Sequence, residues 1–75
     1  MSGNRDEFLK GLAFLLECDA QKVVPEANLV DLGPWDSLNV MGCVVLIDDV
    51  YAKVVHGRQI AECVTVADVL KIAEA

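Results

Sequence analysis

The chain has 75 residues, 55% of them apolar, and a formal net charge of −6 from 12 acidic and 6 basic side chains. A chain of this length is expected to fold as one small domain, residues 1–75, with a modest core and no room for a catalytic cleft of ordinary depth. The negative charge disfavours nucleic acid as a partner.

The first predicted element is a helix over residues 5–17. Asn4 is its expected cap, and apolar side chains recur at helical spacing from Phe8 to Leu16. An irregular segment over residues 19–34 follows. It contains two prolines and a glycine, and we expect its scattered apolar residues to pack against the helices.

The second main helix is predicted over residues 37–53, with Asp36 as its N-cap. Its β-branched side chains would also suit a strand. However, the apolar run is long, does not alternate with polar residues and follows a cap, which together favour a helix.

Two further helices are expected after Gly57, which breaks the chain. The first is a short helix or turn over about residues 58–63, and a last helix starts at a capping box on Thr65 and extends to about Glu74. Four side chains of the last helix should face inward: Val66, Val69, Leu70 and Ala73. The predicted fold is all-α, a small four-helix bundle of three main helices and one short helix with a long first loop.

The helix over residues 37–53 carries two apolar stripes. Val40, Val44, Ile47 and Tyr51 share one face, and one face suffices for a small bundle. The second stripe is expected to be an exposed docking face, with two acids beside it: Leu38, Met41, Val45, Asp48 and Asp49. Burial of Leu38 and Val45 at seams between helices is the alternative.

The middle of the chain is acidic. Between Val23 and Ala52 there are five Asp or Glu residues and no Lys or Arg. Such a surface would attract basic partner surfaces, although a solvated face kept for solubility is the other interpretation.

Ser37 is the main candidate for chemistry. It stands at a helix start, where unpaired N–H groups and the helix dipole stabilise a phosphate. A serine hydrolase would need a base, and His56 is the only histidine. There is no Gly-x-Ser-x-Gly elbow, and we expect His56 at a helix C-terminus beside Gly57. No catalytic residue is therefore predicted.

The three cysteines are widely spaced and odd in number: Cys18, Cys43 and Cys63. They fit neither a metal motif nor a disulfide framework, so we expect free thiols, buried or half-buried, in a reducing cytoplasm, and no metal site. We expect no signal peptide, because the acidic residues Asp6 and Glu7 interrupt the N-terminal segment. The longest apolar run, residues 40–47, is too short for a membrane span. A cytoplasmic protein without membrane insertion is expected.

Three segments occur in an order and spacing that match a known family. They are Leu32-Gly33 with Asp36-Ser37-Leu38, then Ile47-Asp48-Asp49-Val50-Tyr51, then Thr65-Val66-Ala67-Asp68-Val69-Leu70. The first resembles the Asp-Ser-Leu attachment motif of acyl carrier proteins and of the related peptidyl and D-alanyl carriers. The other two are similar to the family's acidic-aromatic segment and to the opening of its last helix. The resemblance covers residues 5–74.

The resemblance implies that a phosphopantetheinyl transferase (a holo-acyl carrier protein synthase) attaches 4′-phosphopantetheine from coenzyme A to Ser37. Asp36 would cap the helix and be recognised by the transferase together with Leu38. The protein would be a monomeric, non-catalytic carrier of acyl thioesters for fatty-acid, polyketide or related synthesis. Its other partners would be acyl ligases, ketosynthases or acyltransferases.

Family members often hold the acyl chain between helices. Here the resemblance implies a cavity with six candidate residues: Val44, Ile47, Tyr51, Ile60, Val64 and Leu70. Two other functions stay open. The chain could be a peptidyl or D-alanyl/aminoacyl carrier, or an unmodified helical adaptor that binds partners through its exposed stripe.

The chain departs from fatty-acid carriers at three places. Its approach to the serine has an extra residue, Gly33-Pro34-Trp35-Asp36. Asn39 and Gly42 replace residues that are often acidic, and Ala52 replaces a frequent glycine. These departures favour a specialised discrete carrier, and the Trp-Asp-Ser-Leu form is similar to carriers of secondary-metabolite or envelope-modifying pathways.

Overall fold

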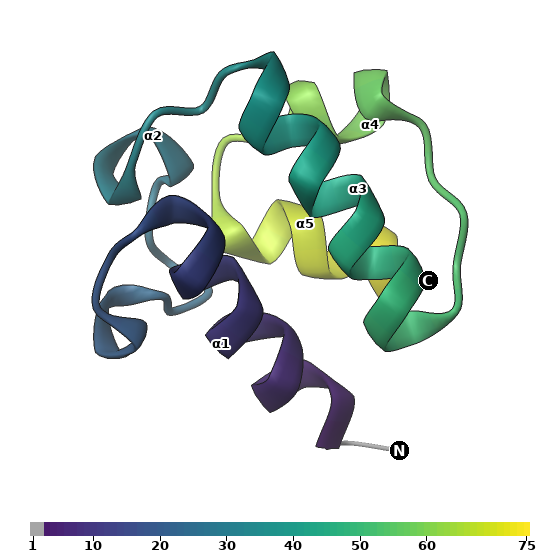
Figure 1. The fold of residues 1–75 in the computed structure, drawn as a ribbon, viewed down its shortest axis with the longest axis horizontal. Coiled ribbons are helices and arrows are strands. Elements are labelled where there is room, and N and C mark those ends of the chain that lie inside the picture. The colour runs from purple at the N-terminus through teal and green to yellow at the C-terminus, as the bar shows by residue number, and fades with distance from the viewer. Residues whose placement is uncertain (1–2) are drawn as a thin grey trace.

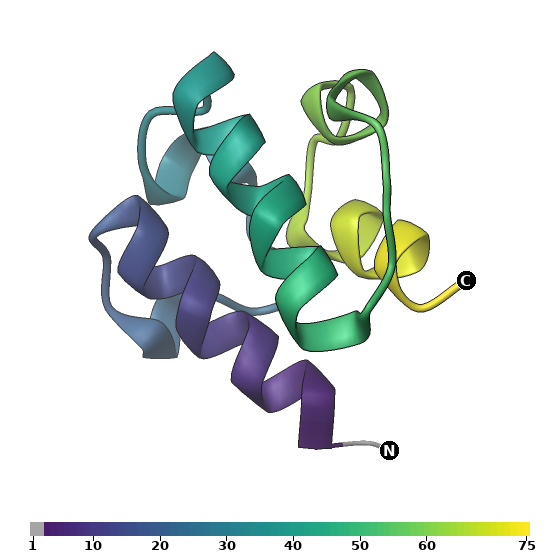
Figure 2. The ribbon, with the colours of Figure 1, turned by 45° about the vertical axis from the view of Figure 1, so that its right-hand side comes forward.

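The computed structural model describes residues 3–75. Its three longer helices are α1 (Gly3–Leu16), α3 (Ser37–Tyr51) and α5 (Val66–Ala73). Figure 2 shows α3 between α1 on one side and α5 with the short α4 (Gly57–Ala61) on the other, and Figure 1 shows α5 behind α3. No strand occurs in the described part of the chain, so the prediction of an all-α fold with three main helices is confirmed.

The long first connection contains two short elements that the sequence did not predict. They are η1, a 3₁₀ turn (Ala20–Lys22), and α2 (Leu29–Leu32). Of its apolar residues that were expected to pack against the helices, Val23 and Leu29 are buried and Leu32 is half-buried, whereas Val24 is 42% exposed. The segment is fixed by pairing with the chain before α5. Leu29 N–H donates to the Val64 carbonyl (2.9 Å), and Val66 N–H donates to the Ala27 carbonyl (3.0 Å).

Three predicted helix boundaries were wrong by two residues. α1 begins at Gly3, so Asn4 lies inside the helix and is not its cap. α3 ends at Tyr51 because Ala52 adopts the left-handed conformation (φ 54°, ψ 43°). α4 ends at Ala61, where a helix to residue 63 was expected.

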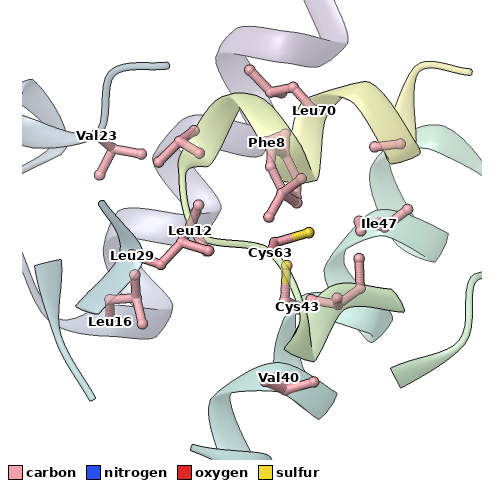
Figure 3. Close-up of a cluster of buried hydrophobic side chains, with 14 of the residues drawn as sticks. Phe8, Leu12, Leu16, Val23, Leu29, Val40, Cys43, Ile47, Cys63 and Leu70 are labelled. Carbon is pink, nitrogen blue, oxygen red and sulfur yellow. The ribbon is translucent and has the colours of Figure 1, made fainter. Parts of the chain in front are cut away.

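Inward faces of α1, α3 and α5 supply most of the core (Figure 3). The four side chains of α5 that were expected to face inward are at most 3% exposed. The capping box at Thr65 is also confirmed. Asp68 N–H donates to Thr65 Oγ1 (3.2 Å), and Thr65 N–H donates to Asp68 Oδ2 (3.1 Å). These contacts fix where α5 starts and how it faces the core.

Two glycines allow α1 and α3 to cross closely. A Cβ on Gly11 would lie 2.7 Å from Leu46 Cδ1, and a Cβ on Gly42 would lie 2.6 Å from Leu15 Cδ1. Each leucine therefore packs over the glycine of the opposite helix. Gly42, which replaces an often acidic residue of fatty-acid carriers, has a packing role here.

The end of α5 is tied to α1 and α3 by polar contacts. Arg5 pairs with the Glu74 carboxylate through two hydrogen bonds, and Tyr51 OH donates to Glu74 Oε2 (3.0 Å). The Arg5 guanidinium holds the pKa of Glu74 below its usual value. Burial, reinforced by the Glu74 carboxylate, raises the pKa of Tyr51 to about 12.

Candidate functional site

Ser37 is exposed and is the first residue of α3. The helix starts there because Asp36 caps it, as predicted. The Asp36 backbone is extended, and Asp36 Oδ1 accepts a hydrogen bond from Asn39 N–H (3.0 Å). A helix begun in this way leaves the N–H groups of Ser37 and Leu38 without a helical carbonyl partner. This first turn can therefore stabilise an anion on the serine.

Two contacts hold the start of the segment before Ser37, at Gly33 and Pro34. Gly33 lies so close to the end of α1 that a Cβ there would be 2.8 Å from the Leu16 carbonyl oxygen. At the next residue, the Pro34 carbonyl accepts a hydrogen bond from Asn39 Nδ2 (2.7 Å), which ties the segment to α3. An acid at position 39 could not donate this bond. The sequence identified Asn39 only as a difference from fatty-acid carriers, because nothing in the sequence shows that its side-chain amide contacts residue 34.

Trp35 is half-buried against the core, directly before the cap. Its Nε1 is buried and has no hydrogen-bond acceptor among residues 3–75. Because a buried donor without a partner costs stability, the indole N–H of Trp35 is a site to test by substitution.

The outward stripe of α3 is exposed, as expected. Leu38, Met41 and Val45 are 78%, 55% and 65% exposed, and Asp48 and Asp49 are exposed on the same helix. The inward stripe differs slightly from the expectation. Val40, Cys43 and Ile47 are buried, whereas Val44 and Tyr51 are half-buried.

A family model of the phosphopantetheine attachment site matches residues 7–72, which is most of the chain. The chain belongs to the phosphopantetheine-attachment family. None of the curated proteins matches the chain closely enough to count as a relative. Domains of this family receive a covalent 4′-phosphopantetheine group and are in general non-catalytic carriers, so the protein is a phosphopantetheine carrier.

The first turn of α3 fits this group in this carrier. Attachment needs a hydroxyl that a second enzyme can reach, and the resulting phosphodiester needs donors beside it. Exposure of Ser37 meets the first requirement, and the unpaired N–H groups of Ser37 and Leu38 meet the second.

Residues expected around a cargo do not all come together in the carrier. Ile47, Ile60 and Leu70 are buried in the core, where Figure 3 shows Ile47 and Leu70 with Phe8. Val44 and Tyr51 lie at the edge of that cluster. Val64 is 61% exposed and lies outside it, because the backbone of its segment pairs with Leu29 and leaves this side chain on the surface.

A groove of about 920 Å³ lies elsewhere, between α1 and α3. Its lining includes Phe14 and Leu15 from α1 and Val45 and Leu46 from α3, but no residue of α4 or α5. The sequence did not predict it, because it depends on how closely α1 approaches α3.

The cysteines are free thiols, as expected, with Cys43 and Cys63 buried and Cys18 half-buried. Figure 3 shows Cys43 and Cys63 together in the core, where Cys63 Sγ donates to the Gln59 carbonyl (3.4 Å). Burial raises the pKa of Cys43 to about 12 and that of Cys63 to about 11, so neither thiol is an ionised nucleophile near neutral pH.

The expected position of His56 was wrong. It is the N-cap residue of α4, not the end of a helix, and its N–H donates to Gln59 Oε1 (3.1 Å). The reason is that Gly57 starts a helix rather than breaking one. In residues 3–75 no group of three or more His, Cys, Asp or Glu residues could hold a metal ion. None of the described helices is both long and apolar enough to cross a bilayer.

Proposed function

We propose that Ser37 is the residue that receives 4′-phosphopantetheine and that the protein, a single domain over residues 1–75, carries acyl groups. The observation that supports this most is the exposed hydroxyl of Ser37 at the capped start of α3, in a chain of the attachment family. In the transfer, Ser37 Oγ forms a bond to the phosphorus next to the pantetheine. The pyrophosphate bond of coenzyme A breaks, adenosine 3′,5′-bisphosphate leaves, and a base of the transferase takes the hydroxyl proton.

Residues next to Ser37 present it to the transferase. Asp36 holds the start of the helix through its hydrogen bond from Asn39, so the serine keeps a fixed direction. Leu38 is exposed beside it and offers an apolar contact. When bound, the arm supplies a terminal thiol that holds the cargo as a thioester.

We further propose that partner enzymes dock on the exposed stripe of α3: Leu38, Met41, Val45, Asp48 and Asp49. An apolar patch with acids at one end suits partners with an apolar contact surrounded by basic residues. Those partners would be acyl ligases, ketosynthases or acyltransferases of a cytoplasmic pathway of fatty-acid, polyketide or related synthesis, and the carrier would meet them as a monomer.

For the cargo we propose insertion between α3, α4 and α5. Val44, Ile47, Tyr51, Ile60 and Leu70 would surround it, and Val64 would stand at the mouth. Ile47, Ile60 and Leu70 are packed in the structure, so an acyl chain would have to displace them.

Modification is tested by intact-protein mass after incubation with coenzyme A, Mg²⁺ and a broad-specificity phosphopantetheinyl transferase. The wild type should gain the mass of one arm. Ser37→Ala should gain nothing, and Ser2→Ala is the matched control because these are the two serines of the chain. A folded wild type that gains no mass with several transferases would exclude Ser37 attachment. Loading of amino acids instead of fatty acids onto the arm would identify a peptidyl or aminoacyl carrier.

A further inference from the structure

The groove between α1 and α3 has an apolar floor and an apolar rim. Leu15 and Leu46 lie over Gly42 and Gly11 at the crossing of the two helices, which forms the floor. Phe14 and Val45 stand at the rim, one from each helix. Figure 2 shows the two helices side by side along this face.

Phe14 is the most exposed large apolar side chain among the described residues, at 88%. On α1 it points away from the core face made by Phe8, Leu12 and Leu16, which are buried. The fold therefore does not use its ring. A single exposed apolar residue needs no explanation, but an exposed aromatic ring beside an apolar groove is typical of a binding surface.

The charges that line the groove indicate which kind of partner it binds. Glu17, Asp48 and Asp49 line it, and no basic residue does. A second copy of the chain would bring its own three carboxylates against these, so self-association through this face is disfavoured. A bare alkyl chain would gain nothing from the acids. A partner with basic residues around an apolar contact complements both the apolar lining of the groove and its three acids.

We propose that the groove binds an amphipathic helical segment of a partner protein, with apolar side chains against Phe14, Leu15 and Val45 and Arg or Lys against the acids. A helix in a groove between two helices is a common mode of recognition. This site goes beyond the carrier function, because it centres on α1 and does not need a modified Ser37. It shares Val45, Asp48 and Asp49 with the proposed docking stripe, so one partner can cover both.

The test uses the Ser37→Ala protein, which cannot carry the arm, and a fluorescein-labelled helical peptide with leucines at i, i+3, i+4 and i+7 and arginines elsewhere. Fluorescence anisotropy should show saturable binding that weakens as salt is raised. A peptide with glutamates in place of the arginines should not bind. In the Ser37→Ala protein, Phe14→Ala should weaken binding at least about tenfold, as expected for an aromatic anchor.

A second variant and a matched control keep the test decisive. Val45→Ala should weaken binding in the same direction, whereas Val54→Ala, exposed but outside the groove, should leave it unchanged. The proposal is overturned if Phe14→Ala binds as tightly as its parent or if the glutamate peptide binds equally well. A dimer that Phe14→Ala converts to monomers would also overturn it, since the occupant would then be a second copy. Ser37 modification is measured separately by mass, so either proposal can fail alone.

Discussion

Gly33 offers a sharp test of how the attachment segment is held. Its backbone is fully extended (φ 173°, ψ −178°), which alanine adopts without strain, so Gly33→Ala adds only the contact of a new Cβ. That Cβ would lie 2.8 Å from the Leu16 carbonyl oxygen and 3.3 Å from Leu16 Cβ. The nearest atom belongs to the backbone of α1 and cannot rotate away. The segment before Ser37 must therefore move by several tenths of an ångström.

The expected cost follows from two opposing effects. Overpacking of this kind costs about 1–3 kcal/mol. Replacing a glycine by alanine lowers the entropy of the unfolded chain and returns about 0.4–1 kcal/mol. We expect Gly33→Ala to lower the free energy of unfolding by about 1–2 kcal/mol.

Gly57→Ala is the matched control. Its Cβ would lie 3.5 Å from the flexible Met41 Sδ, an ordinary contact, in the first residue of α4. In this variant only the lower entropy of the unfolded chain remains, so the free energy of unfolding should rise by about 0.4–1 kcal/mol.

Urea unfolding measures both variants, with an unchanged slope showing that the unfolded state is the same. Gly33→Ala should also be modified more slowly by the transferase, because the segment that carries Ser37 has moved. Gly57→Ala should be modified at the wild-type rate. Equal stability of Gly33→Ala and wild type, or equal losses in the two variants, would refute the reasoning.

Three further predictions concern stability. Ala52→Gly should stabilise the fold by about 0.5–1 kcal/mol, because glycine relieves the left-handed backbone at the end of α3. Its control is Ala67→Gly, at an exposed helical position, which should cost about 1 kcal/mol of stability. A lower melting temperature in both variants would contradict the left-handed backbone at Ala52. Trp35→Phe removes a buried donor without an acceptor while shrinking the ring, so the two effects should cancel to within about 1 kcal/mol. A larger loss of unfolding free energy, measured in urea, would show that the indole N–H has a hydrogen-bond acceptor. Glu74→Gln should lower the melting temperature at pH 7, where the ionised carboxylate pairs with Arg5. Because the pKa of Glu74 is depressed in the fold, this contribution is complete above the ordinary value of 4.5 and is lost as the pH falls through the folded-state pKa. The two melting curves should therefore converge in acid, and a gap that stays constant with pH would rule out the ion pair as its cause.

The sequence predicted features that depend on neighbouring residues. The cap at Asp36 and the capping box at Thr65 are local hydrogen bonds, and both occur in the structure. The exposed stripe of α3 follows from helical spacing within one element, and it is also found. The place of Ser37 at the start of α3 needs only these local rules, so the candidate site was accessible from the sequence.

Features that depend on distant residues were missed. α2 is held partly by the hydrogen bond from Leu29 to Val64, and spacing along the chain cannot show this pairing. His56 was assigned to the wrong helix end because Gly57 is equally compatible with a break and with a helix start. The groove depends on the glycine crossings of α1 and α3, and a single sequence does not show that Gly11 meets Leu46.

The departures from fatty-acid carriers have structural roles that fit together. The extra residue before Ser37 lengthens the approach, and Asn39 ties that approach to α3 through the Pro34 carbonyl, a bond that an acid could not donate. Gly42 accepts Leu15 from α1, where a longer side chain would force Leu15 to move. The first half of α3 carries no acidic side chain, and Asn39 and Gly42 there supply a hydrogen bond and a packing contact. The acidic residues of this helix, Asp48 and Asp49, lie in its second half and line the groove. A partner that binds the acidic residues of α3 must therefore contact its C-terminal half, next to α1.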